Sequence, residues 1–295
     1  MISNVKNIWH LLKDAAIAWD DDNIGEHGAA LSFFTMLSLS PLLIIVVVLS
    51  SVGFGREAAN GHLVSQIRGL IGTDGATFVQ GLISNAYRAD ANLSAAAFGI
   101  IMLLLGATGV FIQLRDSLNM IWRVRQKPRG AIRGFVRVRL LSFAMILGIG
   151  FLLLVSLTIS AVMSAASVYI SGHFSILAGL VTLTEVLISF AGITVVFVLL
   201  FKFLPAVILR WRDAWVGAAF TSILFSIGKY LIGLYLGNGM MGTTFGAASS
   251  LVIIMMWTYY SSQIILYGAE FTRFYALRYG TEIVPSANGI RITEQ

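Results

Sequence analysis

Cysteine is absent from this 295-residue chain, and charged residues make up only 12% of it. Without thiols the chain can form no disulfide, no thiolate metal site and no cysteine nucleophile. Ordinary soluble domains are about one-quarter charged, so this composition, which is 57% hydrophobic, is not that of a water-soluble globule. In water the long apolar segments would expose a large apolar surface, which favours a place in a lipid bilayer.

The apolar residues fall into windows long enough for transmembrane helices, which need about 20 residues to cross about 30 Å of hydrocarbon. The sequence predicts an all-α polytopic bundle of about six transmembrane helices within residues 29–271. The expected spans, in chain order, are residues 29–52, 93–114, two within 140–203, 215–236 and 247–268.

The segments outside the spans complete the predicted domain organisation. In residues 1–28, Trp9, Leu12, Ala16 and Trp19 recur at helical spacing. This pattern predicts either an interfacial helix on the inner membrane surface or a cytoplasmic helix packed on the bundle. We also expect short helices capping the outer face in an outer loop at 53–92, a basic cytoplasmic loop at 115–139 and a cytoplasmic tail at 272–295. The first 28 residues contain no cleavable signal pattern, so the first span is expected to be an uncleaved anchor.

The basic residues predict the orientation, because cytoplasmic loops of membrane proteins are enriched in Lys and Arg. With alternate loops assigned to opposite sides, one side carries sixteen basic residues and the other only Arg56, Arg68 and Arg88. This asymmetry predicts that both termini are cytoplasmic.

Several motifs together resemble one known family. They are Ala-Leu-Ser-Phe-Phe-Thr-Met-Leu-Ser-Leu-Ser-Pro at 30–41, Leu-Arg-Asp-Ser-Leu-Asn-Met-Ile-Trp at 114–122, Phe-Leu-Pro at 203–205 with Trp-Arg-Asp-Ala-Trp-Val-Gly-Ala at 211–218, and Phe-Gly-Ala-Ala-Ser-Ser-Leu at 245–251 with Trp-Thr-Tyr-Tyr-Ser-Ser at 257–262 and Gly-Ala-Glu-Phe at 268–271. In this order, over about residues 8–278, the chain resembles the YihY or BrkB-like family of bacterial inner-membrane proteins. The resemblance implies six spans and an inner-membrane location, but it supplies no catalytic residues. Members of that family have also carried ribonuclease and virulence-factor labels.

The residues themselves argue against a ribonuclease. A nuclease needs clustered metal ligands or a positioned acid and base, whereas His10, His27, His62 and His173 are scattered through different loops. We therefore expect no enzyme activity, no catalytic or metal site, no cofactor and no nucleic-acid partner. The basic residues at 123–139 are interpreted as an orientation signal that also contacts anionic phospholipid headgroups.

Two charges inside the expected spans are the first candidates for a transport pathway, because charges are costly in lipid. Glu185 lies in the fourth span, and Lys229 lies in the fifth beside Tyr230. The hypothesis is that Glu185 and Lys229 face the bundle interior and either form a pair or line a water-filled cavity. The alternative is that Lys229 snorkels to the interface and Glu185 accepts hydrogen bonds from hydroxyl groups.

Pro41 interrupts the backbone hydrogen bonding of the first span, and the flanking Ser38 and Ser40 could satisfy the carbonyl that it leaves free or bend the helix. Pro41 and Ser38 belong to the same candidate pathway, although proline kinks are also common in purely structural spans.

A second candidate set is a polar layer at the cytoplasmic helix ends. It consists of Gln113, Arg115, Asp116, Asn119, Arg212, Asp213 and Glu270. One interpretation is a network of ion pairs that locks the helix ends together, and the other is a cytoplasmic gate or headgroup site.

The leading functional hypothesis is a transporter or lipid translocase that moves an amphiphile or small solute without nucleotide hydrolysis. The alternative is a structural or assembly membrane protein without transport activity. The sequence permits an oligomer in either case.

Overall fold

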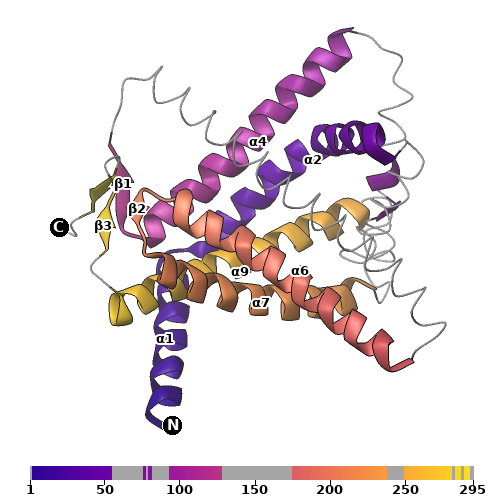
Figure 1. Ribbon diagram of the computed structural model, residues 1–295. Coiled ribbons are helices and arrows are strands. Elements are labelled where there is room, and N and C mark those ends of the chain that lie inside the picture. The colour runs from indigo at the N-terminus through magenta and orange to yellow at the C-terminus, as the bar shows by residue number, and fades with distance from the viewer. Residues whose placement is uncertain are drawn as a thin grey trace. The chain divides into compact units, whose positions relative to one another are not determined.

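The computed structural model describes residues 2–54, 76–77, 79–81, 93–127, 175–237, 249–280, 283–286 and 289–292, and most of them are helical (Figure 1). The long helices are α1 (Ile2–Asp21), α2 (Ile24–Phe54), α4 (Leu93–Ile121), α6 (Ser175–Phe203), α7 (Trp211–Gly237) and α9 (Ser249–Tyr279). The predicted helical membrane architecture is confirmed at this level. Three segments of the described residues are long and apolar enough to cross a membrane, namely Val186–Phe203, Trp211–Ile232 and Leu251–Tyr279. The count of six spans stays a prediction, and the third expected span lies outside the described residues.

The chain divides into two compact units. The first unit consists of Met1–Ala18, Leu118–Leu224 and Tyr267–Gln295, and the second of Trp19–Ser117 and Phe225–Leu266. Helices α4, α7 and α9 each contribute to both units, so each unit contains part of these helices and is described by itself below.

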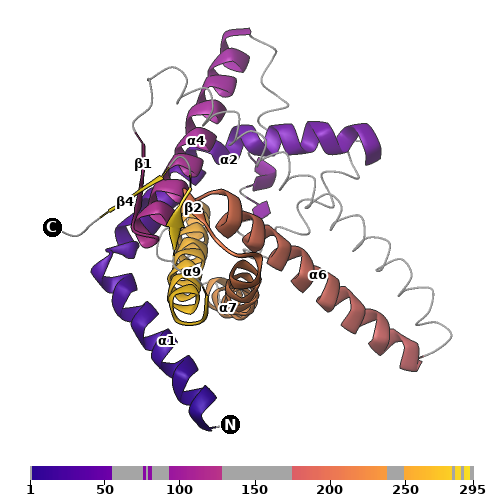
Figure 2. The same cartoon turned by 60° about the vertical axis from the view of Figure 1, so that its left-hand side comes forward.

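In the first unit, α7 and α9 pack through a reciprocal pair of glycine and threonine residues. A Cβ atom at Gly217 would overlap the side chain of Thr272, and one at Gly268 would overlap the side chain of Thr221. Each threonine hydroxyl also donates a hydrogen bond to the carbonyl four residues earlier in its own helix, over 2.8 Å from Thr221 to Gly217 and 2.6 Å from Thr272 to Gly268. Both threonines are completely buried. The two helices lie side by side in both views (Figures 1 and 2).

Helix α1 packs against the same helices. Leu11 and Ala15 are buried against Phe271, and the Tyr267 hydroxyl donates to the Leu12 carbonyl over 3.0 Å. Leu11 and Ala15 form this packed face, whereas Ala16 is exposed, and the choice between an interfacial and a cytoplasmic helix stays a prediction. Trp9 remains 67% exposed, so α1 also presents an apolar residue outside that contact.

Four short strands, β1 (Val124–Gln126), β2 (Val207–Ile208), β3 (Val284–Pro285) and β4 (Gly289–Arg291), depart from the all-α expectation. Strand β1 pairs antiparallel with β4, and β2 pairs antiparallel with β3. The segment expected to be a cytoplasmic tail from residue 272 thus continues α9 to Tyr279. It then folds back onto the connections that follow α4 and α6.

In the second unit, α2 and α4 approach closely at two glycines of α4. A Cβ atom at Gly106 would lie 2.7 Å from the Ser38 backbone nitrogen, and one at Gly109 would overlap Phe34. These two small residues therefore allow close contact between the helices.

The first prediction concerns the α7–α9 contact. We expect Gly217→Ala to lower stability by about 1–3 kcal/mol, because a new methyl group must displace the rigid, branched side chain of Thr272. The matched control is Gly81→Ala, since a Cβ atom at Gly81 meets nothing within 4 Å. Thermal unfolding of both variants in detergent measures the difference, and equal melting temperatures would contradict this account of the contact.

Candidate functional site

The structure describes the candidate pathway residues only in part. The side chain of Lys229 is exposed on α7, beside Ile227 and Tyr230, which are 53% and 67% exposed. Glu185 belongs to α6, but its side chain lies outside the described residues. Because these two residues also belong to different units, the pairing of Glu185 with Lys229 stays a prediction.

Helix α2 runs without interruption through Pro41. Ser38 is buried, and its hydroxyl donates to the Thr35 carbonyl over 3.0 Å. Proline leaves free the carbonyl four residues earlier, which belongs to Leu37. The hydrogen bond found for Ser38 therefore does not serve the carbonyl that it was expected to satisfy. The side chain of Pro41 lies outside the described residues.

In the second unit, the polar layer joins α2 to α4 through a histidine. His27 Nδ1 lies 3.1 Å from the amide nitrogen of Gln113 and 2.9 Å from the Ser117 hydroxyl. The Ser117 hydroxyl also lies 2.8 Å from the Gln113 carbonyl, and its single proton can serve only one of these two acceptors at a time. Sequence reasoning missed this contact because His27 and Gln113 are 86 positions apart and neither belongs to a motif that would link them.

Arg115 and Asp116 follow the second expected span, and loss of solvent shifts both pKa values. Burial lowers the pKa of Arg115, and the negative charge of nearby Asp116 partly opposes this shift. Burial raises the pKa of Asp116, against the opposing charges of Arg115 and His27. For both groups, desolvation therefore affects the pKa more than the attraction between the two charges.

In the first unit, Asn119 connects α4 to the turn before α7. Its side-chain oxygen accepts a hydrogen bond of 2.7 Å from the backbone nitrogen of Ala206, and Asn119 is buried. Asp213 is also buried, in the first turn of α7, where the positive end of the helix dipole stabilises a carboxylate. Its neighbour Arg212 is exposed.

Glu270 is completely buried on α9, and Arg273 Nη1 lies 3.1 Å from Glu270 Oε2. Arg273 is 14% exposed in its side chain and was absent from the predicted layer. This ion pair lies within α9 and joins no two helix ends, so the network interpretation stays a prediction. The spacing of three residues in the Glu-Phe-Thr-Arg sequence is the signal that could have revealed the ion pair.

The described residues show no arrangement typical of a metal site. Among them, no group of three or more His, Asp or Glu side chains is placed to hold a metal ion. Two of the polar contacts join separate segments, namely those of His27 with α4 and of Asn119 with Ala206, whereas the Glu270–Arg273 pair lies within α9.

The apolar helices and the polar contacts between them define a helical membrane protein. Comparison with known sequences agrees, because a family model described as virulence factor BrkB matches residues 16–289. The chain belongs to this family.

Relatives include UPF0761 membrane proteins of Ralstonia nicotianae, Verminephrobacter eiseniae and Delftia acidovorans, which are 30%, 28% and 28% identical over 90%, 86% and 96% of this chain. The chain covers 58%, 59% and 66% of these three proteins, respectively. Their names describe them as membrane proteins and mention no activity. No solved structure matches the chain.

The Glu270–Arg273 pair predicts an asymmetry between two substitutions. We expect Arg273→Gln to lower stability by about 3–5 kcal/mol, because it removes a cation from beside a carboxylate with no solvent access. Glu270→Gln should cost less, since Arg273 keeps some exposure and can turn its charge to water. Denaturation in detergent measures the stability of both variants. A greater loss of stability in Glu270→Gln would contradict the explanation that an unpaired buried carboxylate is the more costly of the two changes.

Proposed function

We propose that this membrane protein is a transporter or lipid translocase that moves an amphiphile or small solute across the bacterial inner membrane without nucleotide hydrolysis. Both termini are proposed to lie in the cytoplasm, following the asymmetry of basic residues in the sequence. Membership of a family of membrane proteins is consistent with this function but does not select it.

The observation that carries the proposal is the exposed Lys229 on a helix of membrane-spanning length. At a rise of about 1.5 Å per residue, Lys229 lies about 27 Å along the helix from Trp211 and about 12 Å from Gly237. Its exposed apolar neighbours on α7 include Ile223, Ile227 and Leu231, each 50% exposed or more.

A cation that faces pure hydrocarbon costs free energy. The same cation can attract the anionic headgroup of an amphiphile. The apolar side chains would contact the tails, and the ammonium group would attract the head. Glu185 is proposed to lie on the same route and to balance the positive charge of Lys229 when no substrate is present.

Lipid flux in reconstituted vesicles tests this function. The full chain would be incorporated into liposomes that contain nitrobenzoxadiazole-labelled phosphatidylglycerol, and dithionite quenching would follow the arrival of labelled lipid at the outer leaflet. We expect the protein to accelerate this movement relative to protein-free vesicles. Lys229→Gln should reduce the rate about tenfold, because a charge-assisted hydrogen bond is worth about 1.5–3 kcal/mol.

Lys13→Gln is the matched control, because Lys13 is an exposed lysine of α1 outside the expected spans. It removes the same charge and should leave the rate unchanged. Folded wild-type protein that moves lipid no faster than empty vesicles would refute lipid translocation and favour the structural alternative. An equal loss of rate in both lysine variants would show that Lys229 has no specific role.

A further inference from the structure

A patch of aromatic and basic side chains lies in the first unit, where α6 ends and α7 begins. This Trp211 patch consists of Lys202, Phe203, Arg210, Trp211, Arg212 and Trp215. The three aromatic side chains are about half exposed, and both arginines are exposed as well. The chain leaves α6, forms β2 and enters α7 within this short stretch (Figure 1). Large aromatic side chains therefore face outward beside cations.

Contacts within the patch hold the indole ring of Trp211. The Lys202 ammonium group lies 5.2 Å from the centroid of that ring and donates a hydrogen bond to the Leu209 carbonyl. The Phe203 ring meets the Trp211 ring edge to face, with 6.0 Å between the two centroids. The aromatic part of the patch is therefore an ordered surface that joins the end of α6 to the start of α7.

The connection that carries the patch is held by its backbone. The nitrogen of Ala206 donates to the Asn119 side-chain oxygen over 2.7 Å, and the carbonyl of Ala206 accepts from the backbone nitrogen of Ser286 over 2.9 Å. Leu204 and Leu209 on either side are buried, and β2 pairs with β3. A surface that is already ordered loses less conformational entropy when it binds a partner.

The exposed charge of the patch is positive. Arg210 and Arg212 flank Trp211, and neither forms a salt bridge with an acidic side chain that the structure describes. Asp213 is the acidic residue of this segment, and it is buried. Its Oδ2 atom lies 2.7 Å from the place that a Cβ atom at Gly280 would occupy, so the carboxylate is directed toward the end of α9.

The position of the patch along the apolar helices indicates what it meets. The apolar segment Val186–Phe203 ends in the patch, and the apolar segment Trp211–Ile232 begins in it. Indole rings are enriched at membrane–water interfaces, where the ring contacts acyl chains and the N–H group meets the headgroups. Basic side chains at the same level attract anionic headgroups. A lipid with an anionic headgroup therefore complements both the aromatic and the basic part of the patch.

We propose that the Trp211 patch binds an anionic phospholipid, with the phosphate group beside Arg210 and Arg212 and the acyl chains along α7. Guanidinium groups match the geometry of phosphate oxygens and can donate two parallel hydrogen bonds to them. Trp215 lies three positions after Arg212 and so is its neighbour on the helix surface. The half-exposed Ile223 lies about three turns after Arg212 and continues that face of α7 for the acyl chains.

This lipid site is separate from the basic loop at 123–139, for which headgroup contact was predicted from the sequence. It also does not rest on the proposed transport, because a lipid bound at the outer surface of the helices need not cross the membrane.

Binding of single phospholipids to the full chain in detergent, measured by native mass spectrometry, tests the proposal. The probes are dioleoyl phosphatidylglycerol and dioleoyl phosphatidylcholine, which share their tails and differ in net charge. We expect the wild-type protein to bind phosphatidylglycerol at least about tenfold more tightly. Arg210→Gln and Arg212→Gln should each weaken that binding about fivefold, the contribution of one basic residue near anionic headgroups, and leave the affinity for phosphatidylcholine unchanged. Both side chains are exposed, so neither substitution should disturb the fold.

Arg125→Gln is the matched control, because Arg125 is an exposed arginine of the same unit that lies on β1, outside the Trp211 patch. It removes the same charge and should change the affinity for phosphatidylglycerol less than about twofold. Selective loss in the two patch variants supports the site. Equal loss in Arg125→Gln would indicate diffuse attraction and overturn the proposal, as would equal affinity of the wild-type protein for the two lipids. A dimer that Arg212→Gln separates, without a preference for phosphatidylglycerol, would assign the patch to contact between two copies of the chain and overturn it too.

The Trp211 patch and the transport function can fail separately. Lipid flux that persists in Arg212→Gln after the preference for phosphatidylglycerol is lost would confine the patch to lipid binding. Absence of flux in a wild-type protein that keeps this preference would count against transport alone.

Discussion

Close approach of α7 and α9 depends on two glycines that leave room for the threonines of the facing helix. Helices in lipid gain little hydrophobic free energy by associating, so they rely on van der Waals contact between small residues. The threonine hydroxyls at 221 and 272 remain satisfied within their own helices, while the hydroxyl and methyl groups together fill the space beside the facing glycines. The contact therefore provides close packing without leaving these two hydroxyls unsatisfied.

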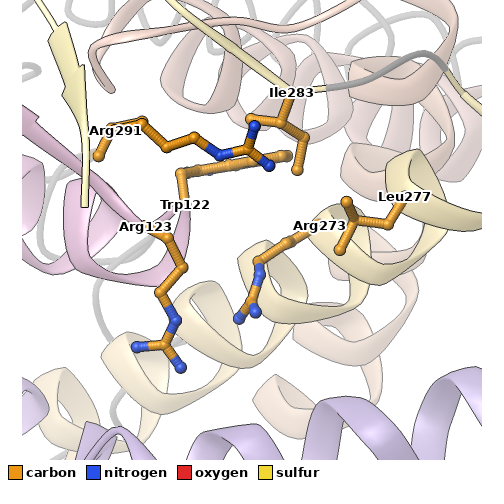
Figure 3. Close-up of a pocket in the computed structure, with 7 residues that line it drawn as sticks. Trp122, Arg123, Arg273, Leu277, Ile283 and Arg291 are labelled. Atoms are coloured by element: carbon orange, nitrogen blue, oxygen red, sulfur yellow. The ribbon is translucent and has the colours of Figure 1, made fainter. Parts of the chain in front are cut away.

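This contact also determines where the charged groups of α9 can lie. Glu270 stands between Gly268 and Thr272 in the sequence, and Arg273 follows directly. A shift of α9 by a fraction of a turn would move the buried carboxylate of Glu270 and the guanidinium group of Arg273 together, since both belong to one rigid helix. The same arginine lines a cavity with Arg123 and Arg291 (Figure 3), so the geometry of that cavity depends on packing between small residues of α7 and α9.

The sequence predicted the features that repeat along the chain and missed those that depend on distant partners. Apolar segments of about 20 residues identified α2, α4, α6, α7 and α9, because hydrophobic length is a strong local signal. The pairing of β1 with β4 was not predictable in this way, since strands of three residues carry almost no periodicity and these two lie far apart in the chain. The same reason applies to Asn119 and Ala206, whose hydrogen bond joins positions 87 residues apart.

Arg123 and Arg125 show a limit of counting basic residues in loops. The count predicted which side of the membrane the loop lies on, but not which arginine lines a cavity. Both arginines contribute equally to the basic loop from which the orientation was predicted. Successive side chains of a strand point to opposite faces, so residues 123 and 125 would share a face if the strand included both; instead Arg123 lies in the turn before β1 with a positive φ of 53°. One arginine lines a cavity with Arg273 and Arg291, while the other is exposed. Two arginines of one basic loop thus differ in their surroundings, because the backbone folds only one of them toward α9.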